Sequence, residues 1–371
     1  RVHVPGGEFH GGSSPGGPAI LPLPAAAAAA TQNGRMDSVT QAVLGAAVGV
    51  AVMGRRTGVW KAAVAGAVAG TVPDLDVLVS HGDPVLDMVQ HRSHSHSLFW
   101  LSLAGPVAGW LLARLLGEGA LRWRWSLAIW LGLVTHPLLD AFTVYGTQLL
   151  QPFSDRPYGL GSVFIVDPFY TVPLMVGLAW ALRSRGSPRG LAANRLALAV
   201  SCAYLGWGVA VQQHVETAAR ESLAAHGVAA QRVLVSPAAF TSGLWRVVAI
   251  DDGHYYEGFR SLFDRSPHVA FDRYDRGAAL EPAMASIDAV RRLQAFSHGY
   301  YRLFERGDRL MISDLRMGME PNYLFTFEVA ERRSAPVALV PPRQVGMRVD
   351  LSRAWPWYWQ RLAGDPVSMR R

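Results

Sequence analysis

Three short polar motifs interrupt long apolar runs and concentrate histidine and aspartate at their edges. HRSHSHS fills residues 91–97, PDLD precedes it at residues 73–76, and THPLLD follows at residues 135–140. Ionisable side chains at the edges of membrane spans are costly to keep there, so they usually have a function. Several nitrogen and oxygen ligands that converge, with one coordination position left open, make a catalytic metal site. The three motifs therefore predict a metal centre.

The spacing within the motifs favours such convergence. His136 and Asp140 are four residues apart, which places both side chains on one face of a helix. Pro137 between them is expected to loosen the turn and kink the helix toward the site. Asp74 and Asp76 flank one residue in a turn or strand-like segment, where alternation points both carboxylates the same way.

We expect the metal ligands to come from six of these residues: Asp74, Asp76, His91, His96, His136 and Asp140. A mixture of imidazole and carboxylate favours Zn²⁺, with Mn²⁺ or Fe²⁺ as alternatives, over Ca²⁺. Such an ion would lower the pKa of bound water toward neutrality. We expect Arg92 to hold an anionic group of the substrate, and Asp76 or Asp167 to act as a general base.

Each of these residues also has a simpler explanation. A single His or Asp near the end of a span is usually a solvated loop residue or a helix cap. Asp140 could pair with Arg92 or Arg156, and Asp167 could cap a helix that begins at Pro168. The number of polar residues gathered in apolar sequence favours a metal or proton site over coincidence.

The apolar sequence predicts an α-helical polytopic membrane domain over residues 36–213. Half of the residues are hydrophobic, the mean hydropathy is +0.15, and nearly all long apolar runs precede residue 214. About six helices are expected, at residues 39–53, 59–72, 97–116, 125–145, 164–182 and 196–213. The first two fall short of the roughly 20 residues that span a bilayer, so they could tilt, thin the bilayer or form a re-entrant hairpin.

Glycines four residues apart occur in both short helices, as Gly45 with Gly49 and Gly66 with Gly70. Small residues at this spacing let two helices approach closely in lipid. The same spacing also arises by chance in sequence rich in Ala and Gly.

The basic residues predict the orientation. The loops 54–61, 114–124 and 183–195 carry ten Arg and Lys, whereas the loops 73–96 and 146–163 carry only Arg92 and Arg156. The positive-inside rule places the first set in the cytoplasm. The site and everything after residue 213 then lie on the extracytoplasmic side of the cell (inner) membrane.

The net charge and the cysteine content bear on nucleic-acid binding, disulfide bonds and cysteine-based metal sites. The net charge of +7 and pI of about 9.8 could suggest nucleic acid, but much of the excess Arg lies in the short loops, so no nucleic-acid partner is expected. Cys202 is the single cysteine, which excludes a disulfide within the chain and a cysteine-based zinc site.

The two ends of the chain differ from the apolar part. Residues 1–35 are rich in Gly, Pro and Ala, and we expect a disordered or non-native extension ahead of a natural start at Met36. A cleaved signal peptide is disfavoured because there is no basic start followed by a leucine-rich core.

Residues 214–371 predict an extracytoplasmic α+β domain with an antiparallel sheet. Strands are expected at residues 243–250 and 253–260, joined in a hairpin, and at 309–316 and 322–329, with a helix at 283–296. Trp355, Trp357, Tyr358 and Trp359 could lie at a membrane interface or clasp the core of this domain.

The motifs, in this order, resemble the YdjM-like inner-membrane metal-dependent hydrolases over about residues 36–182. The resemblance rests on residues 36–45, 70–76, 91–97, 135–140, 145–153 and 163–170. It implies a bacterial or archaeal multi-pass membrane hydrolase, and its functional positions fall on Asp74, Asp76, His91, Arg92, His96, His136, Asp140 and Asp167. Many members have His at the position of Gln41 and a bulky apolar residue at that of His94, so either residue could join the site.

We therefore predict a membrane-embedded metal-dependent hydrolase that acts on an ester or phosphoester of a lipid-linked or amphipathic substrate. A transporter of metal ions or protons could use the same cluster, and a non-catalytic anchor for the C-terminal domain is a third hypothesis. Transporters usually carry internal repeats and a site near the midplane. This sequence has no internal repeat, and its predicted ligands gather at one membrane face, which favours the enzyme.

Overall fold

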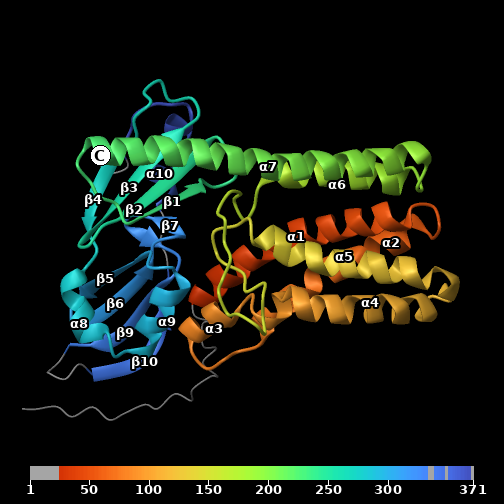
Figure 1. The fold of residues 1–371 in the computed structure, drawn as a ribbon, viewed down its shortest axis with the longest axis horizontal. Helices are drawn as coiled ribbons and strands as arrows, with labels where there is room; N and C mark the ends of the chain where they lie inside the picture. Colours follow the sequence, from red (N-terminus) through yellow and green to blue (C-terminus); the bar gives the residue numbers. More distant parts are fainter. Residues whose placement is uncertain (1–24, 333–337, 347–349, 369–371) are drawn as a thin grey trace, which may run out of the picture.

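The computed structural model describes residues 25–332, 338–346 and 350–368. It consists of a helical bundle followed along the long axis by a domain of antiparallel sheets (Figure 1). The bundle is built from α1 (Ala25–Met53), α2 (Val59–Thr71), α4 (Leu98–Leu115), α5 (Arg122–Asp140), α6 (Pro168–Arg183) and the first half of α7 (Pro188–Ala225). The short elements η1 (Val72–Leu78), α3 (Pro84–Gln90), η2 (His94–His96) and η3 (Gly119–Leu121) connect them.

Helix length does not support six full spans. Among the described residues, α4 and α7 are long and apolar enough to cross a membrane, whereas α2 has 13 residues and α6 has 16. The predicted helix 125–145 is also corrected, because α5 ends at Asp140. Beyond it the chain turns back across the end of the bundle, and the backbone N–H groups of Leu160 and Ser162 donate to the carbonyls of Ala141 and Phe142.

Helical backbone extends upstream of Met36, since α1 begins at Ala25. Residues 1–24 lie outside the described part, so the expected extension ahead of Met36 stays a prediction. Alanine has the highest helix propensity of all residue types, so the run of alanines at the start of α1 favours helical backbone there.

Helices α1 and α2 pack through their glycines. A Cβ atom at Gly45 would lie 2.2 Å from the Gly66 carbonyl oxygen, and one at Gly49 would lie 2.4 Å from the Ala62 carbonyl oxygen. The four-residue glycine spacing is therefore a close helix contact, not a chance pattern.

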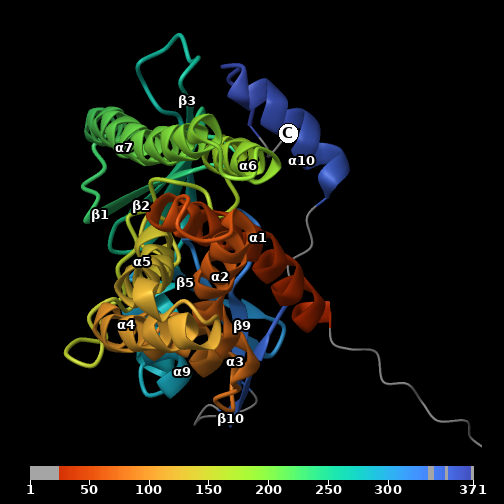
Figure 2. The same cartoon turned by 90° about the vertical axis from the view of Figure 1, so that its right-hand side faces the viewer.

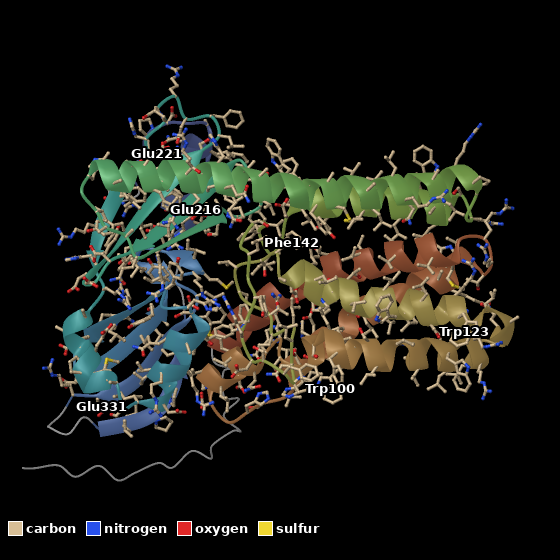
Figure 3. All side chains as sticks on the ribbon, viewed as in Figure 1. Trp100, Trp123, Phe142, Glu216, Glu221 and Glu331 are labelled. Atoms are coloured by element: carbon tan, nitrogen blue, oxygen red, sulfur yellow. The ribbon has the colours of Figure 1, made fainter. Side chains whose placement is uncertain are left out.

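The outer surface of the bundle is apolar. Exposed hydrophobic side chains occur on all six of its helices: Val39, Val64, Val68, Leu103, Val107, Leu127, Val172, Val176 and Leu196 are examples. The basic loops lie together at the end far from the sheets, near Trp123 (Figure 3). This surface is typical of a helical domain that faces lipid along its sides.

The C-terminal domain has two four-stranded antiparallel sheets, where a single sheet was expected. The first has the order β1 (Arg232–Pro237), β2 (Leu244–Ile250), β3 (His254–Ser261) and β4 (Phe271–Asp275). The second has the order β10 (Ala338–Gln344), β9 (Thr326–Glu331), β6 (Arg309–Asp314) and β5 (Tyr301–Arg306). The remaining elements are β7 (Gly318–Met319), β8 (Asn322–Tyr323), η4 (Ala278–Leu280), α8 (Glu281–Met284), α9 (Asp288–Phe296) and α10 (Leu351–Leu362).

The predicted hairpin is confirmed, because β2 and β3 pair with Ile250 opposite Tyr255. The predicted helix 283–296 is interrupted between α8 and α9, and the predicted strand 322–329 is divided between β8 and β9. Strands β1, β4, β5 and β10 were not predicted. Strands β4 and β5 are hard to recognise in the sequence because charged Asp, Arg and Glu stand among their aromatic residues. Both strands lie at the edges of their sheets.

Two connections join the domains. Helix α7 runs without a break from the bundle onto the first sheet, where Val215 and Ala219 share a core with Trp245. Met88 and Tyr145, from the loop end of the bundle, share another core with the second sheet. The loops that carry the predicted site are thus packed against the C-terminal domain.

Candidate metal centre

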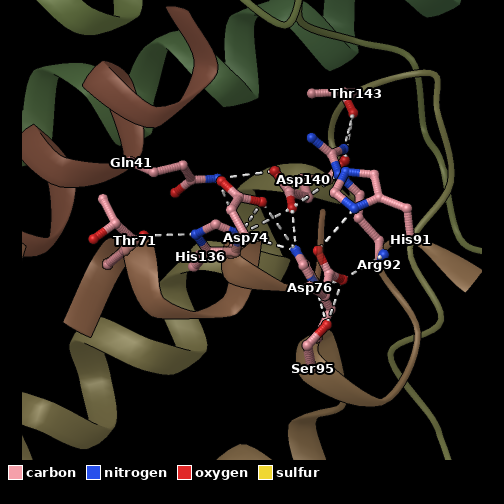
Figure 4. A network of polar contacts seen from close by, with 12 residues as sticks. Gln41, Thr71, Asp74, Asp76, His91, Arg92, Ser95, His136, Asp140 and Thr143 are labelled. Atoms are coloured by element: carbon pink, nitrogen blue, oxygen red, sulfur yellow. Dashed lines mark hydrogen bonds and ion pairs between the residues drawn. The ribbon is translucent and has the colours of Figure 1, made fainter. Parts of the chain in front are cut away.

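Four side chains from three elements meet at the end of the bundle nearest the sheets (Figure 4). Asp74 comes from η1, His96 from η2, and His136 and Asp140 from α5. One potential ligand atom from each lies within 4.8 Å of the others. His96, His136 and Asp140 are at most 1% exposed, whereas the Asp74 side chain is 18% exposed.

The distances between these atoms fit one small cation. The Nε2 atoms of His96 and His136 are 3.0 Å apart, and Asp140 Oδ2 lies 3.3 Å from each. Asp74 Oδ1 lies 3.4 Å from His96 Nε2 and 3.3 Å from His136 Nε2. Ligands bound about 2.0–2.1 Å from a tetrahedral ion are separated from one another by about 3.3 Å.

The hydrogen bonds of the His96 and His136 rings direct the lone pairs of their Nε2 atoms toward the centre of the four-residue cluster. His136 Nδ1 lies 2.6 Å from the Gly70 carbonyl oxygen, which can only accept, so Nδ1 carries the proton. The Ser95 hydroxyl donates to Asp76 Oδ2, so His96 Nδ1 must donate to Ser95 Oγ at 2.9 Å. In the neutral rings both Nε2 atoms are therefore acceptors, as in metal-binding histidines whose other nitrogen donates to the protein.

Two imidazole lone pairs and two carboxylates thus face one point. Without a positive charge between them these four groups repel one another, and burial strengthens the repulsion. The donor set and its spacing fit a divalent ion of the kind that imidazole and carboxylate bind.

Asp140 is held from two further sides. Gln41 Nε2 donates to Asp140 Oδ1 at 2.8 Å, which leaves Oδ2 toward the centre. Arg92 Nε lies 3.3 Å from Oδ2, and Arg92 Nη1 donates to the Thr143 hydroxyl at 3.2 Å. Gln41 therefore orients the carboxylate through its amide nitrogen.

Asp76 organises the loop that presents His96. It lies 2.9 Å from His91 Nδ1 and accepts from the backbone N–H of Arg92 at 3.0 Å and from Ser95 at 2.6 Å. Arg92 occupies the left-handed region with φ of 63°, which this hydrogen bond supports. Burial raises the pKa of Asp76, but the hydrogen bond and charge of His91 outweigh it, so the pKa is lowered.

Asp74 is kept ionised in the same way. Burial raises the pKa of its carboxyl, but when the rings of His136 and His96 carry a proton on Nε2, their hydrogen bonds to Asp74 lower the pKa further than burial raises it. The net result is a pKa well below the usual range, so Asp74 is a carboxylate at neutral pH.

The structure brings together four of the six predicted ligands. Asp76 and His91 lie beside the four-atom group and bond to each other. His94 is exposed and outside the group.

Asp167 does not join the cluster. Its carboxylate caps α6 by accepting from the Phe169 N–H at 2.9 Å, and it accepts from the Tyr204 hydroxyl at 2.8 Å. A cavity of about 10 Å³ is lined by both Asp167 and Asp140, a volume close to the smallest that can hold one water.

The sequence did not predict several supporting groups. Ser95 stands between two candidate histidines, so its hydroxyl was a recognisable candidate. The Gly70 carbonyl is a backbone group with no sequence signal. Tyr145 was missed because it looked like an apolar residue at the end of a span.

Tyr145 connects the site to the C-terminal domain. One side of its ring faces His91, with ring centroids 5.7 Å apart, and the Arg92 guanidinium, 5.1 Å from the ring centroid. Phe296 and Phe325 contact the ring edge-on at 5.5 and 5.6 Å. Residues that position the predicted site are thus backed by side chains of α9 and of the segment between β8 and β9.

Comparison with known proteins finds a match over the segment that contains the cluster. Residues 36–215 match the family model described as YdjM inner membrane protein. This segment is similar to the YdjM inner membrane proteins. The match includes all four residues of the cluster and extends the resemblance noted over residues 36–182 through most of α7.

The Bacillus subtilis (strain 168) protein named "Uncharacterized protein YfhP" is 30% identical to this chain over 161 residues. The alignment covers 39% of this chain and 46% of that protein, so the match spans about half of the relative's length. No solved structure matches the chain.

Proposed function

We propose that the YdjM-like segment is a metal-dependent hydrolase of the membrane, acting on an ester or phosphoester of a membrane-associated substrate. One observation carries the proposal: two imidazole lone pairs and two carboxylates face one point, with each carboxylate 3.3–3.4 Å from the Nε2 atoms, which are 3.0 Å apart, and all four atoms within 4.8 Å of one another. His96, His136, Asp74 and Asp140 would hold the ion, and zinc suits this donor set best. When bound, the ion supplies Lewis acidity and lowers the pKa of water.

Asp76 and His91 are placed to handle protons. They lie on the more open side of the cluster, where the His91 side chain is 27% exposed, and their hydrogen bond fixes the imidazole orientation. We assign proton transfer to this pair, with Asp76 as its orienting carboxylate. Arg92 is buried against Asp140, so we assign it to positioning that ligand and not to holding the substrate.

The surroundings of the open side favour an amphipathic substrate. Val77 and Leu78, which follow Asp76 in η1, are 69% and 79% exposed. Exposed aliphatic side chains next to a charged centre suit a molecule with a polar ester group and an apolar chain. A lipid-linked ester or phosphoester meets both requirements.

We propose that all six bundle helices contribute to the membrane domain, with the basic loops in the cytoplasm. The apolar outer faces of α2 and α6 support this placement although both helices are short. The cluster and the C-terminal domain would then lie on the extracytoplasmic side. A reporter fused after Gly227 should score extracytoplasmic, and a cytoplasmic score would overturn the orientation.

The position of the cluster favours an enzyme over a transporter. The four residues lie at the end of α5, the start of α4 and the turn after α2, and transporter sites usually lie near the midplane.

Metal analysis of the full chain purified in detergent tests the proposal. Wild type should retain about one divalent ion per chain after reloading, and His96→Ala and His136→Ala should each lose most of it. His94→Ala is the matched control, because His94 is in the same short segment but is exposed. Equal metal content in all four proteins would refute the site.

Activity is the second readout. A metal-loaded wild type should hydrolyse an amphipathic phosphoester or ester in a panel of such compounds, and chelation should abolish turnover. Metal binding without turnover on any member, or turnover unaffected by His136→Ala, would reject the hydrolase and leave the metal site standing.

A further inference from the structure

Helix α10 has three distinct faces. Trp357 and Arg361 are buried, and Arg361 pairs with Asp264 while Trp357 contacts Phe259 edge-on. This face docks α10 on the C-terminal domain, as expected for a clasp on the domain core. A second face carries Ser352, Arg353 and Gln360 and is polar and exposed.

The third face is apolar and exposed. Leu351, Trp355 and Trp359 are 69%, 55% and 50% exposed, and their spacing of four residues places them in one stripe along the helix. The rings of Trp355 and Trp359 contact each other edge-on, with centroids 5.4 Å apart. Within the described residues, this stripe packs against no core of the domain.

The stripe lies beside the side of α10 that reaches the bundle. Tyr358, adjacent to it on the helix surface, donates to the Ala239 carbonyl oxygen at 2.6 Å. Phe240, the residue after Ala239, contacts Phe164, which precedes α6. These two contacts place α10 close to the segment that leads into α6.

The orientation of α10 agrees with this position. Figure 2 looks along the bundle, with α4, α5 and α7 seen nearly end-on, and α10 lies across the view. It also lies beside the outline of the bundle and is not hidden behind it. A membrane around the bundle would therefore extend beneath α10, continuous with the apolar side faces of α6 and α7.

We propose that α10 is an interfacial helix whose stripe of Leu351, Trp355 and Trp359 rests in the headgroup layer of the bilayer. A helix that lies in the interface needs an apolar face toward the acyl chains and a polar face toward water. Tryptophan is enriched at this depth because its ring is apolar and its N–H is polar. The helix then holds the C-terminal domain at a fixed tilt over the membrane, independently of any chemistry at the metal centre.

Site-directed fluorescence in lipid tests the proposal. Cys202 is the single cysteine, so a Cys202→Ser background accepts one label at a time. The full chain would be labelled with an environment-sensitive dye at Trp355→Cys or Trp359→Cys and reconstituted into phosphatidylethanolamine/phosphatidylglycerol vesicles. Gln360→Cys, on the polar face of the same helix, is the matched control, and Asp288→Cys on α9 is a second one.

Lipids that carry a quencher near the headgroup should quench the labels at positions 355 and 359 at least several-fold more than those at 360 and 288. A water-soluble quencher should show the reverse order. Equal quenching at all four positions would overturn the proposal. Protection of positions 355 and 359 that persists in detergent and rises with protein concentration would instead show a second copy covering the stripe, and would also overturn it.

Discussion

The role of Gln41 follows from the hydrogen bonds of its amide nitrogen. This nitrogen donates to Asp140 Oδ1 at 2.8 Å, which leaves Oδ2 toward the centre, and to the His136 carbonyl oxygen at 3.3 Å. Groups that orient a ligating carboxylate typically change metal affinity by 10–100-fold when they are removed.

Gln41→Leu should therefore weaken metal affinity by roughly 10–100-fold without abolishing binding. Competition with a metallochromic chelator measures the change. Gln213→Leu, at an exposed position of α7, should leave the affinity unaltered. A Gln41→Leu protein with wild-type affinity would show that Arg92 alone positions Asp140.

Asp167 offers a second test at the scale of one residue. The sequence allowed both a catalytic and a capping role, and the structure places its carboxylate on the first turn of α6. Loss of an N-cap typically costs about 0.5–2 kcal/mol of stability.

Asp167→Ala should lower the thermal midpoint of unfolding and leave metal content unchanged. Asp167→Asn should restore most of the stability, because an amide oxygen also caps. Turnover that falls in Asp167→Asn while its stability is retained would support the catalytic role and contradict capping as the sole function.

At the scale of helices, the contact between α1 and α2 determines where the site lies. Gly70, at the end of that contact, supplies the carbonyl that fixes the His136 ring, and Gln41 lies on the α1 side of it. A displacement of α2 along α1 would move both groups away from α5.

Gly66→Ala should destabilise the bundle by about 1–3 kcal/mol, because overpacking forces backbone apart, and here the new Cβ would lie 2.2 Å from the Gly45 carbonyl oxygen. Gly206→Ala is the matched control, since a Cβ there meets nothing within 4 Å. Thermal unfolding in detergent compares the two. Equal midpoints would mean that α1 and α2 are packed more loosely than this geometry requires.

At the scale of the whole molecule, the C-terminal domain is a structural support of the site. Arg316 donates to the Tyr145 carbonyl oxygen and pairs with the buried Asp314, while Phe296 and Phe325 flank the Tyr145 ring. Because the other side of that ring faces His91 and Arg92, loosening this contact should reach the metal ligands through Arg92 and Asp140.

Tyr145→Leu should lower both the stability and the metal affinity. Tyr301→Leu removes a buried ring of the same hydrophobic core whose polar partners, Glu281 and Arg276, belong to the C-terminal domain, so it should lower stability alone. Metal titrations well below both unfolding midpoints separate the two effects. Parallel loss of affinity in both variants would point to general destabilisation in place of a specific coupling.

The sequence by itself determined the candidate residues of the cluster and the secondary structure that local periodicity encodes. The spacing of His136 and Asp140 placed them on one helical face, the glycine spacing anticipated the α1–α2 contact, and the residues around Gly253 predicted the β2–β3 hairpin. These features depend on neighbours within a few residues, so a sequence pattern is sufficient to recognise them.

Only the tertiary structure decided which candidates share one point. His96 and His136 are 40 residues apart, and Gly70 is 66 residues from the ring that it orients. Whether Asp76 faces the centre or the 91–97 loop depends on how η1 packs, and the spacing of Asp74 and Asp76 is compatible with either. The second sheet and its contact with Tyr145 were beyond prediction for the same reason, since long-range packing sets them and local pattern does not.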